Sequence, residues 1–293
     1  MSTYWQLNLA PLSAAPEALE AQLAELGACA ISFEDAGDEA ILEPELGTTP
    51  LWSQTKISAL FTEESTLHVA LALLKYSYPN LSHTIEMLPE QDWERAWIQH
   101  FQPMQFGNNT WICPSWCDPP VATAVNILLD PGLAFGTGTH ATTALCLQWI
   151  DQANLTDKTV IDYGCGSGIL AIAALLHGAQ HVYAIDHDPQ ALQATKENAE
   201  RNTIALQRLS ILAPEELPKT LQSDVIIANI LATPLIDLAP FFAKQLKAHG
   251  KIILSGILHD QTDTIFAAYQ TYFTDFEVTE QEGWVRVVAS LRK

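Results

Sequence analysis

The sequence predicts an α/β protein in which a mostly parallel sheet is flanked by helices and is preceded by a smaller α+β domain. Three observations lead to this prediction. A glycine-rich turn lies between an apolar strand and an apolar helix within residues 159–188. Strand and helix patterns alternate from there to the C-terminus, where two strands are adjacent. Before residue 89 the pattern is strand, helix, strand, strand, helix, strand. The length of 293 residues also favours two domains.

The smaller domain is predicted over residues 1–88. Alternating and apolar runs indicate strands, and helical periodicity indicates two helices. In chain order these are strand 4–9, helix 14–26, strand 28–34, strand 56–61, helix 66–76 and strand 84–88, with 40–43 as a candidate further strand. This order is that of a ferredoxin-like unit. No catalytic constellation is found in it, so we expect it to recognise a partner; a structural or dimerising role is the alternative.

Residues 89–102 are predicted to be a linker with a short helix. Trp93 and Trp97 are one turn apart on one face of that helix, which favours anchoring of the linker over a ligand platform. Two strands, 111–114 and 125–129, follow. Cys113 and Cys117 form a C-x₃-C pair, but no second pair or suitably spaced histidines complete a zinc site. We therefore expect no metal.

The larger domain is predicted over residues 103–293. Its sheet is expected to be Rossmann-like, seven-stranded and mostly parallel, with an antiparallel pair at the C-terminus. The strands are predicted at 160–163, 181–185, 207–212, 223–229, 250–255, 277–280 and 284–289, and helices at 139–152, 169–176, 189–202, from Pro234, and 260–269. Because ligands bind beyond the carboxyl ends of strands in such sheets, the residues at those ends are the candidates for a site.

The glycine-rich turn predicts a nucleotide-cofactor site. Gly164, Gly166 and Gly168 alternate after the first strand, where glycine permits positive φ and lets a ligand approach the backbone. Asp186 follows the second strand, about 22 residues on, where a carboxylate can bind both hydroxyls of a ribose. The G-x-G-x-G spacing differs from the G-x-G-x-x-G of dinucleotide sites. With Asp162 two residues upstream it suits a ligand that carries an ammonium group, and it resembles motif I of class I S-adenosylmethionine (SAM) methyltransferases.

A second glycine-rich loop, 130–140, precedes the helix at 139–152. Its glycines beside Phe135 indicate a ligand-binding loop that closes over a cofactor, and Thr142 and Thr143 fall in the first helical turn. His140 is the one nearby candidate for a base, and it equally suits a helix cap or the lining of the cofactor site. His177 and His181 flank a helix end and are expected at the surface.

Asn229 ends the fourth strand of the larger domain. In many amino-methylating enzymes, an Asn or Asp there is followed by two prolines and an aromatic residue that stacks on a planar base. Here the sequence continues Ile230-Leu231-Ala232 instead. This argues against a nucleobase or a glutamine amide as methyl acceptor and favours an aliphatic amine positioned by Asn229.

Composition and charge limit the remaining choices. Residues 1–102 hold 15 acids and 3 bases (net −12) and residues 103–293 hold 19 and 11 (net −8), which gives −20 in total. Such a field repels nucleic acid and attracts a basic protein or an amine, although acidity that serves only solubility is an alternative. No run of about 20 apolar residues and no basic leader is found, so we expect a cytoplasmic protein without membrane contact. The five scattered cysteines predict no disulfide.

Several motifs together narrow the prediction. DPGLAFGTGTHATT, VIDYGCGSGILAIAA and ANILATPL, preceded by DWERAW and WICPSW, resemble the bacterial ribosomal protein L-eleven methyltransferase family over essentially the whole chain. The resemblance implies a class I SAM methyltransferase whose ferredoxin-like domain grips the ribosomal protein, and whose second domain methylates its N-terminal α-amine and lysine ε-amines. It implies SAM binding by Thr143, Gly164, Asp186 and Asn229, to which the residues themselves add Asp162, Gly166 and Phe135. We expect a monomer.

Other functions stay open at this point. A SAM-dependent methyltransferase of RNA or of a small amine would share the cofactor site, although the acidic N-terminal domain disfavours RNA. A ribosome-associated module that binds SAM without catalysis is a further alternative, against which Asp162, Asp186 and Asn229 argue. An NAD(P) oxidoreductase fits least, because of the glycine spacing.

Overall fold

The computed structural model describes residues 3–12, 16–37, 39, 41, 48–88, 101–130 and 140–292. The chain divides into two compact units, Met1–His100 and Phe101–Lys293, which are described separately. Two of the predicted elements lie almost wholly outside these residues. Of the candidate strand at 40–43 only Ile41 is described, and of the linker at 89–102, which contains Trp93 and Trp97, only Phe101 and Gln102 are described. Among the helices described, none is long and apolar enough to cross a membrane.

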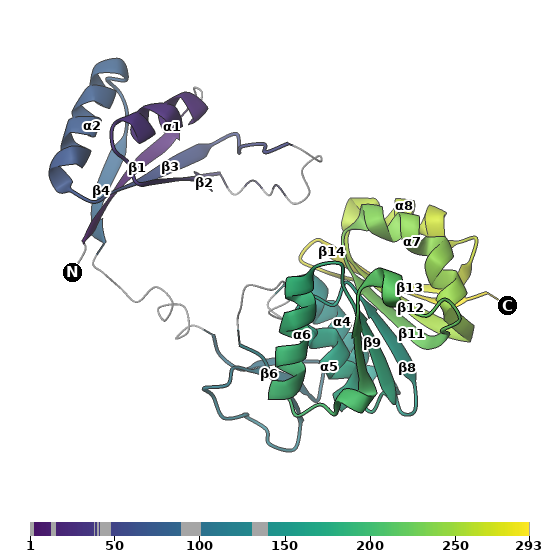
Figure 1. The fold of residues 1–293 in the computed structure, drawn as a ribbon. Helices are drawn as coiled ribbons and strands as arrows, with labels where there is room; N and C mark the ends of the chain where they lie inside the picture. The colour runs from purple at the N-terminus through teal and green to yellow at the C-terminus, as the bar shows by residue number, and fades with distance from the viewer. Residues whose placement is uncertain are drawn as a thin grey trace. The chain divides into compact units, whose positions relative to one another are not determined.

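The N-terminal unit is a four-stranded antiparallel sheet with two helices on one face (Figure 1). In chain order its elements are β1 (Tyr4–Leu12), α1 (Pro16–Glu25), β2 (Ala30–Asp35), β3 (Thr55–Phe61), α2 (Glu64–Ser77) and β4 (His83–Leu88). The strand order β2-β3-β1-β4 is that of the predicted ferredoxin-like unit. One core joins both helices to the sheet, because Leu7 and Leu9 alternate inward from β1 and meet Leu19 and Leu23 of α1 and residues of α2.

The second unit begins with a small three-stranded sheet. Its strands are β5 (Met104–Phe106), β6 (Thr110–Cys113) and β7 (Val125–Leu128), in the order β5-β6-β7. β5 was not predicted, since three residues are too few for a periodic signal. The amide of Asn202, at the end of α6 (Pro189–Arg201), exchanges hydrogen bonds with the backbone of Leu128, which fixes this sheet to the helical layer.

The main sheet has the order β10-β9-β8-β11-β12-β14-β13, and the first five strands are parallel. The two C-terminal strands pair antiparallel, as predicted. The strands are β8 (Thr159–Tyr163), β9 (His181–Ile185), β10 (Leu209–Leu212), β11 (Ser223–Asn229), β12 (Leu246–Leu258), β13 (Phe273–Gln281) and β14 (Trp284–Leu291). The last three are longer than the sequence pattern indicates, because charged and polar residues at their ends pair with neighbouring strands that the pattern does not reveal.

Helices cover both faces of this sheet (Figure 1). α4 (Ala141–Gln152), α5 (Ile169–Leu176) and the inner residues of α6 pack on one face, and α7 (Ala232–Gln245) and α8 (Thr262–Tyr269) pack on the other. The period of two along the strands decides which side chain faces which layer: Val160 and Ile227 enter the first core, whereas Ile161 and Ile226 enter the second. The strands are therefore apolar on both faces, as in other parallel sheets.

The prediction that His177 and His181 lie at the surface is wrong, because both side chains are half-buried. His177 is half-buried at the end of α5, with its Nε2 2.7 Å from the hydroxyl of Thr110, which in turn donates to Asp151. His181 is half-buried at the start of β9, 2.9 Å from the hydroxyl of Ser210. Burial lowers the pKa of both rings. The sequence shows only that the two flank a helix end, whereas their partners come from distant parts of the chain.

Candidate functional site

The glycine-rich turn connects β8 to α5 and takes the backbone shape that the glycines predict. Gly164, Gly166 and Gly168 have φ values of 80°, 53° and 77°, in the region that other residues rarely adopt. At Gly164 there is also no room for a side chain, because a Cβ would lie 2.2 Å from Cγ2 of Ile230. The turn therefore brings its bare backbone to the carboxyl end of the sheet, where a ligand can approach it.

Helix α6 holds this turn from the side. Thr195 is fully buried and donates to the carbonyl of Gly166 at 3.0 Å, while the amide of Asn198 donates to the carbonyl of Ser167 at 2.9 Å. Sequence reasoning missed both residues. A signal was present, since Thr195 and Asn198 are two polar residues one turn apart on the inward face of an amphipathic helix.

Asp186 follows the end of β9, and its carboxylate is 9% exposed. Oδ2 accepts from the backbone N–H of Gly166 at 3.0 Å, and Oδ1 accepts from that of Asp188 at 3.0 Å. Two predicted site residues, Gly166 and Asp186, are thus in direct contact. The carboxylate is held at the strand end by backbone donors, in the place where a ribose would meet it.

Asp162 is the last residue but one of β8, two residues before Gly164. It is fully buried: Oδ2 accepts from the N–H of Ala171 at 2.9 Å, and Oδ1 has no hydrogen-bond partner among the described residues. Burial raises the pKa of this carboxyl to about 7, the Ala171 bond opposes the rise, and the charge of Asp186 adds to it. A buried acid with one unsatisfied oxygen would be stabilised by a nearby cation or donor.

Asn229 and Thr143 meet across the carboxyl end of β11. The amide Nδ2 of Asn229 donates to the hydroxyl of Thr143 at 3.3 Å, and this hydroxyl lies in the first turn of α4 on a side chain that is 1% exposed. The contact joins residues 86 positions apart. It anchors the nitrogen end of the amide to α4, so that the oxygen end is the one left to accept a hydrogen bond.

His140 is the N-cap of α4. Its Nδ1 accepts from the backbone N–H of Thr142 at 3.3 Å, and its ring meets Trp284 edge-on with centroids 4.8 Å apart. Of the roles considered from the sequence, the structure thus gives it the helix cap. Phe135 and the rest of the second glycine loop, 131–139, lie outside the described residues.

The strand order explains why these residues gather. β9, β8 and β11 are neighbours in the sheet, and Asp186, Gly164 and Asn229 stand at their carboxyl ends. This edge offers backbone N–H groups, a carboxylate for hydroxyls, a buried acid with an unsatisfied oxygen and an amide oxygen. The set fits a cofactor that combines a ribose, a cationic amino group and a reactive centre near Asn229, as SAM does.

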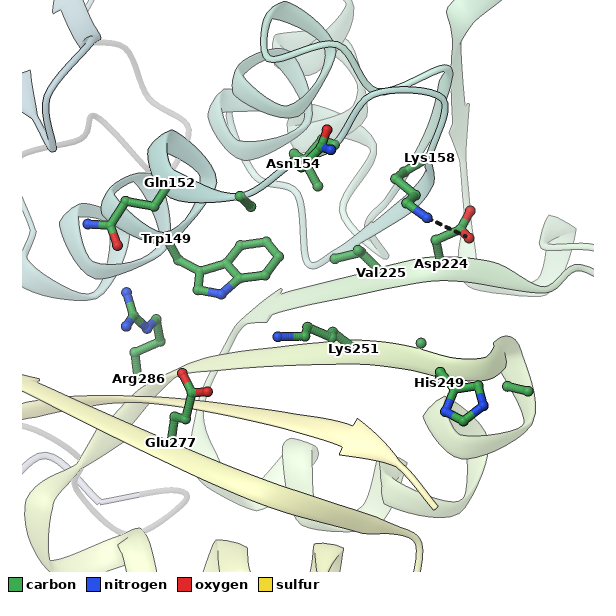
Figure 2. A pocket seen from close by; sticks show the side chains of 14 residues that line it. Trp149, Gln152, Asn154, Lys158, Asp224, Val225, His249, Lys251, Glu277 and Arg286 are labelled. Atoms are coloured by element: carbon green, nitrogen blue, oxygen red, sulfur yellow. Dashed lines mark ion pairs between the residues drawn. The ribbon is translucent and has the colours of Figure 1, made fainter. Parts of the chain in front are cut away.

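A separate pocket lies at the opposite, amino end of the parallel strands (Figure 2). It has a volume of about 560 Å³ and lies between the end of α4, at Trp149 and Gln152, and the starts of β11 and β12. Figure 2 shows Lys158 paired with Asp224 at one side and Arg286 beside Glu277 at the other. None of the predicted site residues lines it. Among the described residues, no group of three or more His, Cys, Asp or Glu side chains could hold a metal, and all five cysteines are free.

Comparison with known proteins gives consistent results over almost the whole chain. Residues 3–292 match the family model described as ribosomal protein L11 methyltransferase (PrmA). A relative of that name from Azotobacter vinelandii is 50% identical over 96% of this chain and 97% of its own, and one from Marinomonas sp. (strain MWYL1) is 48% identical over 93% and 94%. The solved structure of a ribosomal protein L11 methylase from Lactobacillus delbrueckii subsp. bulgaricus is similar, with 34% identity, a TM-score of 0.58, and coverage of 66% of this chain and 100% of that one.

Proposed function

The chain belongs to the ribosomal protein L11 methyltransferase family, and we propose that its second unit transfers methyl groups from SAM to amines of that ribosomal protein. It is a SAM-dependent protein methyltransferase, and its substrate is ribosomal protein L11. The finer proposal is that the N-terminal α-amine and lysine ε-amines are the acceptors. The observation that carries it is the Asn229–Thr143 hydrogen bond, which leaves an amide oxygen at the strand end with no planar aromatic residue beside it in Ile230-Leu231-Ala232.

The cofactor roles follow from the geometry of the turn. We assign the ribose hydroxyls to Asp186, the close backbone approach to Gly164 and Gly166, and the amino group to the side of Asp162, whose Oδ1 is otherwise unsatisfied. Thr143, Asn229 and the loop residue Phe135 complete the assignment, Phe135 from sequence alone. When bound, SAM supplies a methyl group activated by a sulfonium; the protein's part is to position the acceptor and exclude water.

The acceptor nitrogen must lose its proton before it can attack. At pH 7 a lysine with a pKa of about 10.4 is roughly 0.04% neutral, a deficit of about 4.6 kcal/mol, whereas an α-amine near 7.8 lacks only about 1.2 kcal/mol. We assign the proton to water, since His140 uses Nδ1 to cap α4. The oxygen of Asn229 then accepts an N–H of the neutral amine and turns its lone pair toward the methyl group.

The two units divide the work. We propose residues 1–88 as the recognition domain, 89–102 as the linker and 103–293 as the catalytic domain, which the separation of the chain into two compact units near residue 100 supports. We further propose a cytoplasmic monomer that makes no direct contact with nucleic acid. The formal charge of −20 supports this, because it opposes both self-association and approach to phosphates.

The test is a time course of product masses. Purified ribosomal protein L11 is incubated with the protein and SAM, and modified residues are located by fragmentation. We expect methylation of the α-amine to precede that of lysines, and Asn229→Ala to lower kcat/KM about 100-fold and to weaken SAM binding as well, because Asn229 is assigned to both the acceptor and the cofactor. Lysine methylation that clearly precedes the α-amine would contradict the proposed order. Transfer to RNA in place of the protein would contradict the acceptor class.

A further inference from the structure

Helix α2 of the N-terminal unit is apolar on two sides. Its sequence, ESTLHVALALLKYS, places Leu67, Ala70, Leu71 and Leu74 in the core beneath it. Three large apolar side chains lie on the other side: Val69 is 60% exposed, Leu73 is 52% and Tyr76 is 90%. Single exposed apolar residues are ordinary, but several that share one face of a helix form a contiguous apolar patch, which is typical of an interaction surface.

The exposed residues form one stripe. Val69, Leu73 and Tyr76 are spaced by four and three residues, so they lie above one another on successive turns, and exposed Ala72 lies beside them. We call Val69, Leu73 and Tyr76 the α2 stripe. Tyrosine is enriched among the residues that dominate binding at protein interfaces, because it buries a large ring at small entropic cost.

The opposite face of the same sheet has a different character. There Gln6, Asn8 and Ser58 hydrogen-bond to one another, with Ser58 donating to the Asn8 oxygen at 2.8 Å and the Gln6 amide donating to both. Lys56 pairs with Glu34 at 3.0 Å nearby. These polar groups are satisfied within the sheet, so an apolar partner surface would gain little there. Tyr4 of β1 is 37% exposed on this opposite face, so among the described residues the larger unburied apolar area is that of Val69, Leu73 and Tyr76 on the helical face.

The helical layer exposes more acidic than basic side chains. α1 and α2 share one core on the same side of the sheet, and the exposed charged residues of the two helices and of the α2 N-cap are Glu17, Glu20, Glu25, Glu63 and Glu64 against Lys75. The exposed His68 lies 3.6 Å from Glu64. The layer therefore combines an exposed apolar stripe with a net negative charge, which complements a partner surface that has both an apolar patch and lysines.

We propose that the α2 stripe is the docking surface for the protein substrate, contacting an apolar patch flanked by lysines. The inference rests on the proposed function, in which the substrate presents lysines to this protein. Charge favours this occupant over a second copy of the chain. If two copies met through this layer, the five exposed glutamates of one copy would lie opposite the same five of the other and would repel them.

The test compares two variants of the full chain. In the first, Val69→Ser, Leu73→Ser and Tyr76→Ser are combined; all three side chains are exposed, so folding should be unaffected. In the matched control, Leu206→Ser and Val278→Ser change exposed apolar residues of the second unit, at 51% and 48% exposure. Both binding of ribosomal protein L11, by calorimetry, and steady-state methylation are measured. We expect the stripe variant to raise Kd and KM at least tenfold with kcat and SAM affinity within twofold of wild type, and the control to change neither.

Other outcomes overturn the proposal in distinguishable ways. A stripe variant that binds the ribosomal protein as wild type does removes the stripe from the interface and leaves the proposed function intact. Loss of self-association in sedimentation, with KM unchanged, would assign the stripe to a second copy. A lowered unfolding temperature of the second unit, again with KM unchanged, would assign it to the protein's own catalytic unit. A wild-type protein that neither binds nor methylates the ribosomal protein overturns the proposed function and this inference together.

Discussion

At the scale of the residue, Asp162 shows how burial changes what a side chain contributes. From the sequence it is an acid two residues before a glycine turn, suited to an ammonium group. In the fold it is fully buried, bonded through one oxygen to Ala171, and its pKa is raised to about 7. A positive ligand group beside it would favour the ionised form, so cofactor binding and ionisation of Asp162 are expected to be linked.

This predicts a specific dependence of stability on pH. The folded-state pKa is raised above the ordinary value of 3.8, so between about pH 4 and pH 7 the folded protein keeps a proton that the unfolded chain has released. Stability therefore falls as pH rises through this window and levels off above it. The side chain of the Asp162→Asn variant stays neutral at every pH. The free energy of unfolding of this variant, relative to that of wild type, should therefore rise across the window by on the order of 4 kcal/mol.

Urea unfolding of both proteins at several pH values measures the difference. Asp260→Asn, at an exposed carboxyl, is the control and should follow wild type. A difference between Asp162→Asn and wild type that does not change with pH would mean that Asp162 is ionised throughout the window. Addition of SAM should reduce the difference above pH 7, because a cation then offsets the buried charge.

At the scale of the element, the glycine turn depends on the helix that packs beside it. Gly168, the N-cap of α5, has φ 77°, and a Cβ there would lie 2.7 Å from Cγ2 of Thr195 on α6. Gly283, in the turn between β13 and β14, has nearly the same φ of 78°, with nothing within 4 Å of the added atom. Gly283 therefore reports the need for a left-handed backbone alone, whereas Gly168 reports that need together with the lack of space for a side chain.

Alanine substitution at the two glycines should therefore have unequal effects. Gly283→Ala should cost about 1–2 kcal/mol for the left-handed backbone alone. Gly168→Ala should cost about 1–3 kcal/mol more, because Thr195 must move, and should weaken SAM binding, which Gly283→Ala should not. Urea unfolding and calorimetric titration with SAM measure both effects. Equal losses of stability would show that Thr195 moves freely and that α6 does not hold the turn.

At the scale of the whole molecule, the net charge is expected to raise the rate at which the protein associates with its substrate. The formal charge is −20, and the smaller N-terminal part carries −12 of it. A lysine-bearing substrate is attracted at long range by such a field, and salt screens the attraction, since the Debye length falls from about 30 Å at 0.01 M to about 3 Å at 1 M.

The measurement is kcat/KM for ribosomal protein L11 over this range of salt. We expect it to fall at least tenfold, while kcat at saturating substrate changes little, because the buried site is screened less. A neutral crowding agent in place of salt is the control. A kcat/KM that is constant with salt would mean that the acidity serves solubility alone, the alternative that the composition leaves open.

Much of the fold could be predicted because its signals are local. The helix at 169–176 and the strands at 181–185 and 223–229 have the predicted bounds, since each is an apolar run bounded by glycine, proline or polar residues. The ends of β12 and β13 could not be predicted, because the polar residues there adopt strand conformation only by pairing with a neighbouring strand of the sheet, which the local pattern does not reveal. The same limit applies to His177 and His181, whose partners lie elsewhere in the chain.

The sequence by itself determined the type of cofactor and the positions of the candidate site residues Gly164, Asp186 and Asn229 at strand ends, because glycine spacing and strand termini are short-range features. Only the tertiary structure decided how those members are held. It set Thr143 against Asn229 across 86 residues, placed Thr195 and Asn198 behind the turn, and buried Asp162 with an unsatisfied oxygen. The physical reason is that hydrogen-bond geometry and desolvation depend on which strands and helices become neighbours, and a linear pattern does not record that.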